Sequence, residues 1–131
     1  MKKLTLDEIL MFHGKIVKKT GGREGLRDKS LLESAINQVE QTFDGKDLYP
    51  TVIDKISVMT YSLISNHAFV DGNKRIGIAV MIITLKINSI EVYYTQEELI
   101  ELALGVASGK FREKDITSWI DGHGIKRGNS K

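Results

Sequence analysis

Nine consecutive residues, His67 to Arg75, combine a histidine, a carboxylate, a glycine and two cations. An imidazole titrates close to neutral pH, so His67 is suited to taking a proton from an attacking hydroxyl. Asp71 is the one carboxylate of the run, and Mg²⁺ usually binds one or two protein carboxylates together with phosphate oxygens. The run therefore places a candidate general base and a candidate metal ligand close together in the chain.

The second half of this run predicts an anion-binding site. We expect a helix to begin at Asp71 to Lys74, where unpaired backbone N–H groups and the positive end of the helix dipole attract anions. Gly72 would let phosphate oxygens approach the backbone, and Lys74 and Arg75 add two cations. A base, a metal ligand and a phosphate site together indicate transfer of a phosphorus-containing group to a hydroxyl.

Each of these side chains also has an ordinary structural explanation, so the functional interpretation depends on their joint arrangement. We expect Phe69 to anchor the loop in the core, and we assign it no chemistry. His13 and His123 have no partner at a meaningful spacing in the sequence. The first is expected to be an ordinary helix residue and the second to lie in the tail.

The overall composition predicts one compact cytoplasmic domain. The chain has 131 residues, of which 41% are apolar and 27% charged, and its net charge is only +2, so neither nucleic acid nor a membrane surface is an expected direct partner. The absence of cysteine excludes disulfides, zinc–thiolate sites and thiol nucleophiles, and it fits a reducing compartment. No stretch of 18 apolar residues and no signal-peptide core is found.

Helix signals recur along the chain and predict an all-α bundle of about six helices. Thr5 and Thr95 each begin a capping box, Asp28 is a good N-cap, and Gly21 is expected to end the first helix. The helix that follows the His67 to Arg75 run is apolar nearly all round, which predicts that it forms the buried centre of the fold. The expected helices, with their caps, cover residues 5–19, 28–39, 50–66, 71–87, 95–106 and 112–120. We expect one domain over residues 1–121, a polar connection over 43–49, an extended segment over 91–94 and a flexible basic tail over 122–131.

The nine-residue run resembles the signature H-x-F-x-[DE]-G-N-x-R of the Fic/Doc family, and Lys74 in the second-to-last place is typical of the Doc branch. The segment Gly25 to Ala35 is similar to the segment before the second helix of Doc-like toxins, and the resemblance extends over roughly residues 5–120. It implies an all-helical fold with a small flap over the active-site loop, a β-hairpin formed from the Gly-rich segment Thr20 to Arg27. The catalytic residues that it implies are His67 as general base, Asp71 as Mg²⁺ ligand, and Lys74 and Arg75 as phosphate cations. The residues that it implies for ATP or another nucleoside triphosphate are Gly72, Asn73 as a phosphate-positioning amide, Lys74 and Arg75.

The resemblance also implies a biological role and a partner. Doc-like proteins are toxins of type II toxin–antitoxin systems, each neutralised by a small antitoxin whose C-terminal segment folds against it. The Doc branch further implies a protein kinase that phosphorylates translation elongation factor Tu and thereby arrests translation. Adenylyltransferases of the family read G-N-G-R-x-x-R, whereas this chain has Lys74 and Ile78 at the second Gly and second Arg, which favours phosphoryl transfer.

Two alternatives stay open at the level of sequence. Gly72, where many Doc-like motifs have Ala, and Ala68 keep AMP transfer as the alternative reaction. A catalytically silent binding module is the third interpretation, although such modules usually lack the histidine or the acid.

The segment Thr20 to Gly25 formally matches the autoinhibitory motif of Fic enzymes. Two adjacent glycines disfavour the helix that this motif needs. In addition, this chain has Ile78 at the position of the Arg with which the Glu of the motif would pair. We therefore expect inhibition to come from another chain.

Overall fold

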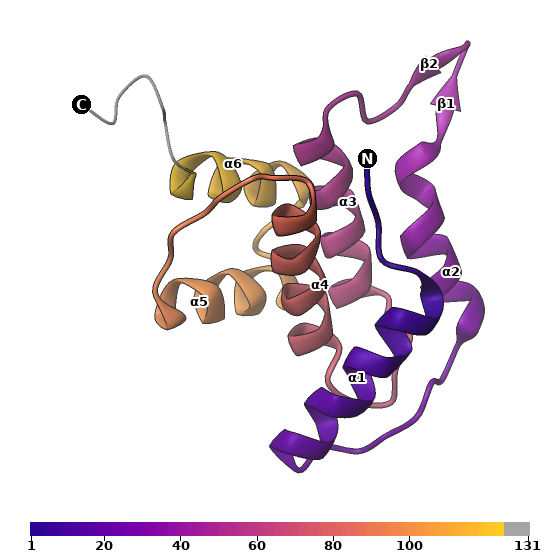
Figure 1. Ribbon diagram of the computed structural model, residues 1–131, viewed down its shortest axis with the longest axis vertical. Coiled ribbons are helices and arrows are strands. Elements are labelled where there is room, and N and C mark those ends of the chain that lie inside the picture. Colours follow the sequence, from indigo (N-terminus) through magenta and orange to yellow (C-terminus); the bar gives the residue numbers. More distant parts are fainter. Residues whose placement is uncertain (125–131) are drawn as a thin grey trace.

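The computed structural model describes residues 1–124, which form six α-helices and one two-stranded sheet (Figure 1). The helices are α1 (Leu6–Thr20), α2 (Lys29–Asn37), α3 (Val52–Ser65), α4 (Asn73–Ile87), α5 (Gln96–Ala107) and α6 (Glu113–His123), and a short 3₁₀ helix covers Gln38–Glu40. The strands are β1 (Thr42–Phe43) and β2 (Lys46–Asp47). The predicted all-α bundle is therefore confirmed. Within the described residues, no helix is long and apolar enough to cross a bilayer.

Capping residues set the helix ends as the sequence predicted. Thr5 with Glu8, and Thr95 with Glu98, form complete capping boxes at the starts of α1 and α5. Gly21 ends α1 in the left-handed conformation, and the Asp28 side chain accepts the Leu31 N–H at the start of α2. Pro50 was expected in the first turn of α3, but Thr51 caps this helix and Pro50 precedes the cap, so the start was predicted too early.

Helices α3 and α4 form the centre of the molecule, and the core lies on both sides of this pair. One cluster of buried side chains joins them to α1 and α2, and it includes Ile9, Leu32 and Ile76. A second cluster joins them to α5 and α6, and it includes Met81 and Ile116. The predicted central position of α4 is confirmed, and the N-terminus of α4 is consequently held by packing along the whole helix.

The one hairpin among residues 1–124 lies between α2 and α3, not in the Gly-rich segment from Thr20 to Arg27. Asp44 and Gly45 both have positive φ (53° and 77°), which is the geometry of a tight two-residue hairpin turn. The hairpin projects from the end of the molecule opposite the loop that joins α3 to α4 (Figure 1). The predicted position of the hairpin is therefore wrong, and the polar connection predicted over residues 43–49 contains it.

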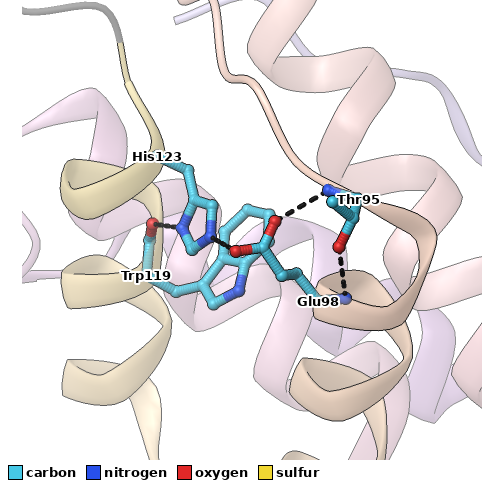
Figure 2. Close-up of polar contacts among 4 residues, drawn as sticks. All are labelled: Thr95, Glu98, Trp119 and His123. Carbon is cyan, nitrogen blue, oxygen red and sulfur yellow. Dashed lines mark hydrogen bonds and ion pairs between the residues drawn. The ribbon is translucent and has the colours of Figure 1, made fainter.

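The packed part of the chain continues beyond the predicted domain end at residue 121. Helix α6 runs to His123, and Gly124 forms an isolated antiparallel bridge with Val92 in the segment predicted to be extended. The His123 ring stacks on Trp119 at 4.0 Å, and its Nε2 lies 3.1 Å from Glu98 Oε2 at the start of α5 (Figure 2). The prediction that His123 is a tail residue is therefore wrong. Residues 125–131 of the predicted basic tail lie outside the described residues.

Candidate active site

The loop from His67 to Gly72, here called the motif loop, joins the C-terminus of α3 to the N-terminus of α4 at the lower end of the molecule in Figure 1. Phe69 is buried, and its ring stacks on His13 of α1 with the centroids 3.7 Å apart and the planes 13° from parallel. Aromatic rings in this geometry pack favourably beyond the area that they bury. The predicted anchoring of the loop by Phe69 is confirmed, and α1 supplies the surface to which it is anchored.

Asn73, the first residue of α4, fixes the loop from its other end. Its Oδ1 accepts the Phe69 N–H and its Nδ2 donates to the Phe69 carbonyl, both at 3.0 Å. The side-chain amide therefore satisfies both backbone groups of one buried loop residue, which would otherwise be costly to leave unpaired. In this structure Asn73 shapes the loop through these two hydrogen bonds, and the phosphate-positioning role of its amide stays a prediction.

An extended segment, Arg23 to Asp28, lies along the motif loop and is here called the cover segment. It pairs with the loop through an isolated bridge between Leu26 and Phe69. The Val70 N–H donates to the Gly25 carbonyl at 3.0 Å, and the Arg27 N–H donates to the Ala68 carbonyl at 2.7 Å. The Gly-rich segment thus does cover the loop, as the resemblance implied, but as a single extended segment with one isolated bridge and not as a hairpin. Its non-helical conformation confirms that no autoinhibitory helix forms there.

His67 stands at the exposed lip of the motif loop. Its side chain is open to solvent, and its backbone is in the left-handed region, with φ at 54°. A non-glycine residue in this conformation is uncommon and persists where neighbouring contacts hold it. The Arg27 guanidinium provides such a contact, because its Nη2 donates to the His67 carbonyl at 2.6 Å. The structure therefore holds the His67 imidazole on a fixed backbone and open to solvent.

The Asp71 carboxylate is held by two backbone N–H groups. Its Oδ2 accepts the Arg23 N–H at 3.0 Å, and its Oδ1 accepts the Gly72 N–H at 2.8 Å. These two hydrogen bonds, with the nearby Arg75 and Arg23 charges, hold the pKa of Asp71 below its ordinary value. The group is consequently a carboxylate at neutral pH, and each oxygen retains a lone pair for a further ligand.

This carboxylate fits the single protein ligand that a Mg²⁺ ion bound mainly by water and substrate phosphates requires. No cluster of three or more possible metal ligands occurs within residues 1–124. A metal at this place would therefore depend on the phosphates of a nucleotide for its other ligands. The chemistry of the donor set agrees with the predicted role of Asp71.

The N-terminus of α4 has the features of an anion site. Gly72 occupies the N-cap position with φ at 76°, and no side chain caps this end of the helix among the described residues. Lys74 and Arg75 in its first turn are exposed, and neither forms an ion pair within residues 1–124. Free first-turn N–H groups beside two available cations are suited to a polyphosphate.

The reason for Gly72 differs from the one that the sequence indicated. A Cβ at this position would lie 3.1 Å from Val17 Cγ1 and 3.5 Å from His13 Nε2, so it would point toward α1. Glycine is required here for the left-handed backbone and for the close approach of α1. The lack of a side chain at Gly72 therefore allows the contact with α1 and does not by itself open space for phosphates. This residue gives no support to the AMP-transfer alternative.

Comparison with known proteins agrees with this geometry. The family model described as Fic/DOC family matches residues 3–85, which include α1, the cover segment, the motif loop and nearly all of α4. The chain belongs to the Fic/DOC family. It is 40% identical over 72 residues to a protein named Toxin Doc from Mycolicibacterium smegmatis, an alignment that covers 55% of this chain and 55% of that protein. It is also 26% identical over 123 residues to the Protein kinase doc of Escherichia phage P1, with 92% of this chain and 94% of that protein covered.

Two sets of contacts in this Fic/DOC site were not predicted from the sequence. His13 was assigned to a helix without a partner, yet it is buried and contacts both Phe69 and the Asp71 carbonyl. The cover segment was expected as a hairpin, and the individual bonds from Arg23 and Arg27 were not anticipated. These contacts join residues separated by 40 or more positions in the chain, so no local spacing reveals them.

Proposed function

We propose that this Fic/DOC protein is a Doc-type protein phosphotransferase, which moves a phosphoryl group from a nucleoside triphosphate such as ATP to a protein hydroxyl. The observation that carries the proposal is the arrangement around the motif loop. One short, firmly held segment carries an exposed histidine, a carboxylate kept anionic and a helix N-terminus with two cations; within residues 1–124, no side chain caps this terminus and neither cation forms an ion pair. This set matches the requirements of phosphoryl transfer, in which positioning and charge stabilisation do most of the work.

Each residue has one task in the proposed reaction. His67 accepts the proton of the attacking hydroxyl as the new phosphorus–oxygen bond forms and the bond to the leaving nucleoside diphosphate breaks. Lys74, Arg75 and the first-turn N–H groups of α4 hold the phosphates and stabilise the charge that develops on them. Asp71 holds Mg²⁺, which would supply Lewis-acid activation of the phosphoryl group when bound with the nucleotide.

We further propose that this activity makes the protein the toxin of a type II toxin–antitoxin pair. The two Doc proteins to which it is similar, one named a toxin and the other a protein kinase, support this role. The proposed substrate is translation elongation factor Tu, and its phosphorylation would arrest translation. The proposed inhibitor is a small antitoxin whose C-terminal segment folds on this protein, because the cover segment is not an inhibitory helix.

The reaction can be tested with ATP labelled at either the α- or the γ-phosphorus. The purified protein is incubated with each label, Mg²⁺ and either elongation factor Tu or a cell extract, and labelled proteins are separated by electrophoresis. We expect a target band that carries the γ label and not the α label. Equal labelling from both forms of ATP would show transfer of AMP and overturn the proposal, and no labelling of any protein would support a silent binding module.

A further inference from the structure

His13 is the one buried histidine of the described chain, and the proposed reaction gives it no task. Its side chain is only 3% exposed and lies between α1 and the motif loop. The ring stacks on Phe69, and its Nε2 lies 2.7 Å from the carbonyl oxygen of Asp71. Since a carbonyl only accepts, Nε2 carries the proton and donates this hydrogen bond. The contact joins α1 to the backbone of the proposed metal ligand.

The peptide unit between Asp71 and Gly72 links His13 to the Asp71 carboxylate. The carbonyl of this unit accepts the His13 hydrogen bond, and the N–H of the same unit donates to Asp71 Oδ1 at 2.8 Å. A trans peptide is planar, with its C=O and N–H directed to opposite sides. Holding the carbonyl in place therefore also fixes the direction of the N–H, and with it the carboxylate that this N–H binds.

The local backbone does not fix the Asp71–Gly72 peptide unit by itself, so a contact from another residue is needed. Gly72 has φ at 76° and no side chain, so the peptide unit before it could rotate more freely than one followed by any other residue. The other bond to the carboxylate, from Arg23, comes from an exposed segment. Among the described residues, His13 is the one buried side chain that donates a hydrogen bond to this peptide unit, and its stacking on Phe69 fixes the ring itself.

We infer that His13 is a positioning residue, which orients the Asp71 carboxylate for Mg²⁺ through the Asp71–Gly72 peptide unit. This inference rests on the proposed function for its consequence in catalysis. The structural part of the inference is that the His13 hydrogen bond fixes the Asp71–Gly72 peptide unit. This part does not depend on which group is transferred.

Two variants separate the hydrogen bond from the packing. His13→Phe keeps an aromatic ring to stack on Phe69 and removes the donor, whereas His13→Gln places an amide N–H near the position of Nε2. The first measurement is amide hydrogen exchange by NMR without any nucleotide. In His13→Phe, we expect the Gly72 and Arg23 amides to exchange on the order of tenfold faster than in the wild type, with helix amides such as that of Val80 unchanged. In His13→Gln, we expect protection close to that of the wild type.

The second measurement is ATP binding by calorimetry in the presence of Mg²⁺ and in the presence of a chelator. In His13→Phe, we expect the increase in affinity that Mg²⁺ provides to fall on the order of tenfold, while binding without Mg²⁺ is retained through Lys74 and Arg75. A purely structural role would lower both affinities together or neither. Unchanged exchange at Gly72 and Arg23 with an unchanged Mg²⁺ effect would overturn the inference. Faster exchange in a protein whose wild type transfers no group would instead retain the structural part and reject the proposed function.

Discussion

His67→Ala should lower the rate of phosphoryl transfer by about 10²–10⁴-fold, the usual contribution of a general base. The side chain is exposed and makes no side-chain hydrogen bond within residues 1–124, so its removal should leave the fold and nucleotide binding intact. The left-handed backbone at this position is held by Arg27 through the main-chain carbonyl, which alanine also has. The loss should therefore appear in kcat and not in the affinity for ATP. It is measured by initial rates with γ-labelled ATP and by calorimetry.

Val70→Ala is the matched control, since Val70 is an exposed residue of the same loop and its side chain has no proposed role. This control should retain activity and arrest the growth of cells that express it, whereas cells that express His67→Ala should grow. Equal growth arrest by the wild type and His67→Ala would exclude the enzymatic account, because toxicity would then not need the base.

Asp71→Asn should lower the rate by about 10²–10³-fold, because Lewis-acid stabilisation by a metal is worth several kcal/mol and each 1.36 kcal/mol is a factor of ten. Asparagine keeps the size of the side chain and an oxygen that can accept a backbone N–H, so the loop should stay in place. The loss should be partly recovered at high Mg²⁺ concentration. The rate is measured as a function of Mg²⁺ for both proteins, and identical Mg²⁺ dependence would contradict the role of Asp71 as metal ligand.

Asp71→Asn should also change how stability depends on pH. In the folded protein, the Arg23 and Gly72 N–H groups hold the pKa of Asp71 below the value of about 3.9 expected for an unfolded chain. The carboxylate therefore stabilises the fold above that pH, and this contribution is lost as the pH falls through the lower, folded-state pKa. The wild type should be more stable than Asp71→Asn near neutral pH, and the difference should shrink in acid, as the pH falls below the ordinary value for a carboxyl group and through the lower, folded-state pKa.

Glu98→Gln is the matched control for this effect. The Thr95 N–H and the His123 imidazole hold the pKa of Glu98 below its ordinary value, but Glu98 lies at the start of α5, in contact with α6 (Figure 2). Its replacement should therefore reproduce the pH dependence of stability and leave transfer activity unchanged. Thermal unfolding at several pH values measures the first property. A pH-independent difference between the wild type and Asp71→Asn would show that the two N–H bonds do not favour the charged form.

The helices could be predicted because their signals are local. Each capping box lies within four residues, and the burial of α4 follows from its composition alone. The hairpin was missed because its strands of two residues are exposed on both faces, so no apolar alternation marks them, and only Asp44-Gly45 signals the turn. The end of α6 was placed too early because its last turn is stabilised by Trp119 and by Glu98 from another helix.

The site shows the same division between local and long-range information. The types and spacing of His67, Asp71, Lys74 and Arg75 could be interpreted in the sequence, because their chemistry depends on residues that are neighbours in the chain. The contacts that hold these residues in place could not be predicted, since the hydrogen bond from His13 to Asp71 joins residues 58 positions apart in the chain. The sequence likewise does not reveal that both groups of the Asn73 amide bind the Phe69 backbone.

The mass of elongation factor Tu after incubation with this protein, ATP and Mg²⁺ tests the central claim most directly. Intact-mass spectrometry is performed on the purified factor, with His67→Ala as the parallel reaction. The account predicts an increase equal to one phosphoryl group, located by fragmentation on a hydroxyl side chain, with the wild type and not with His67→Ala. An increase equal to one AMP group, or the same phosphoryl increase with both proteins, would contradict it.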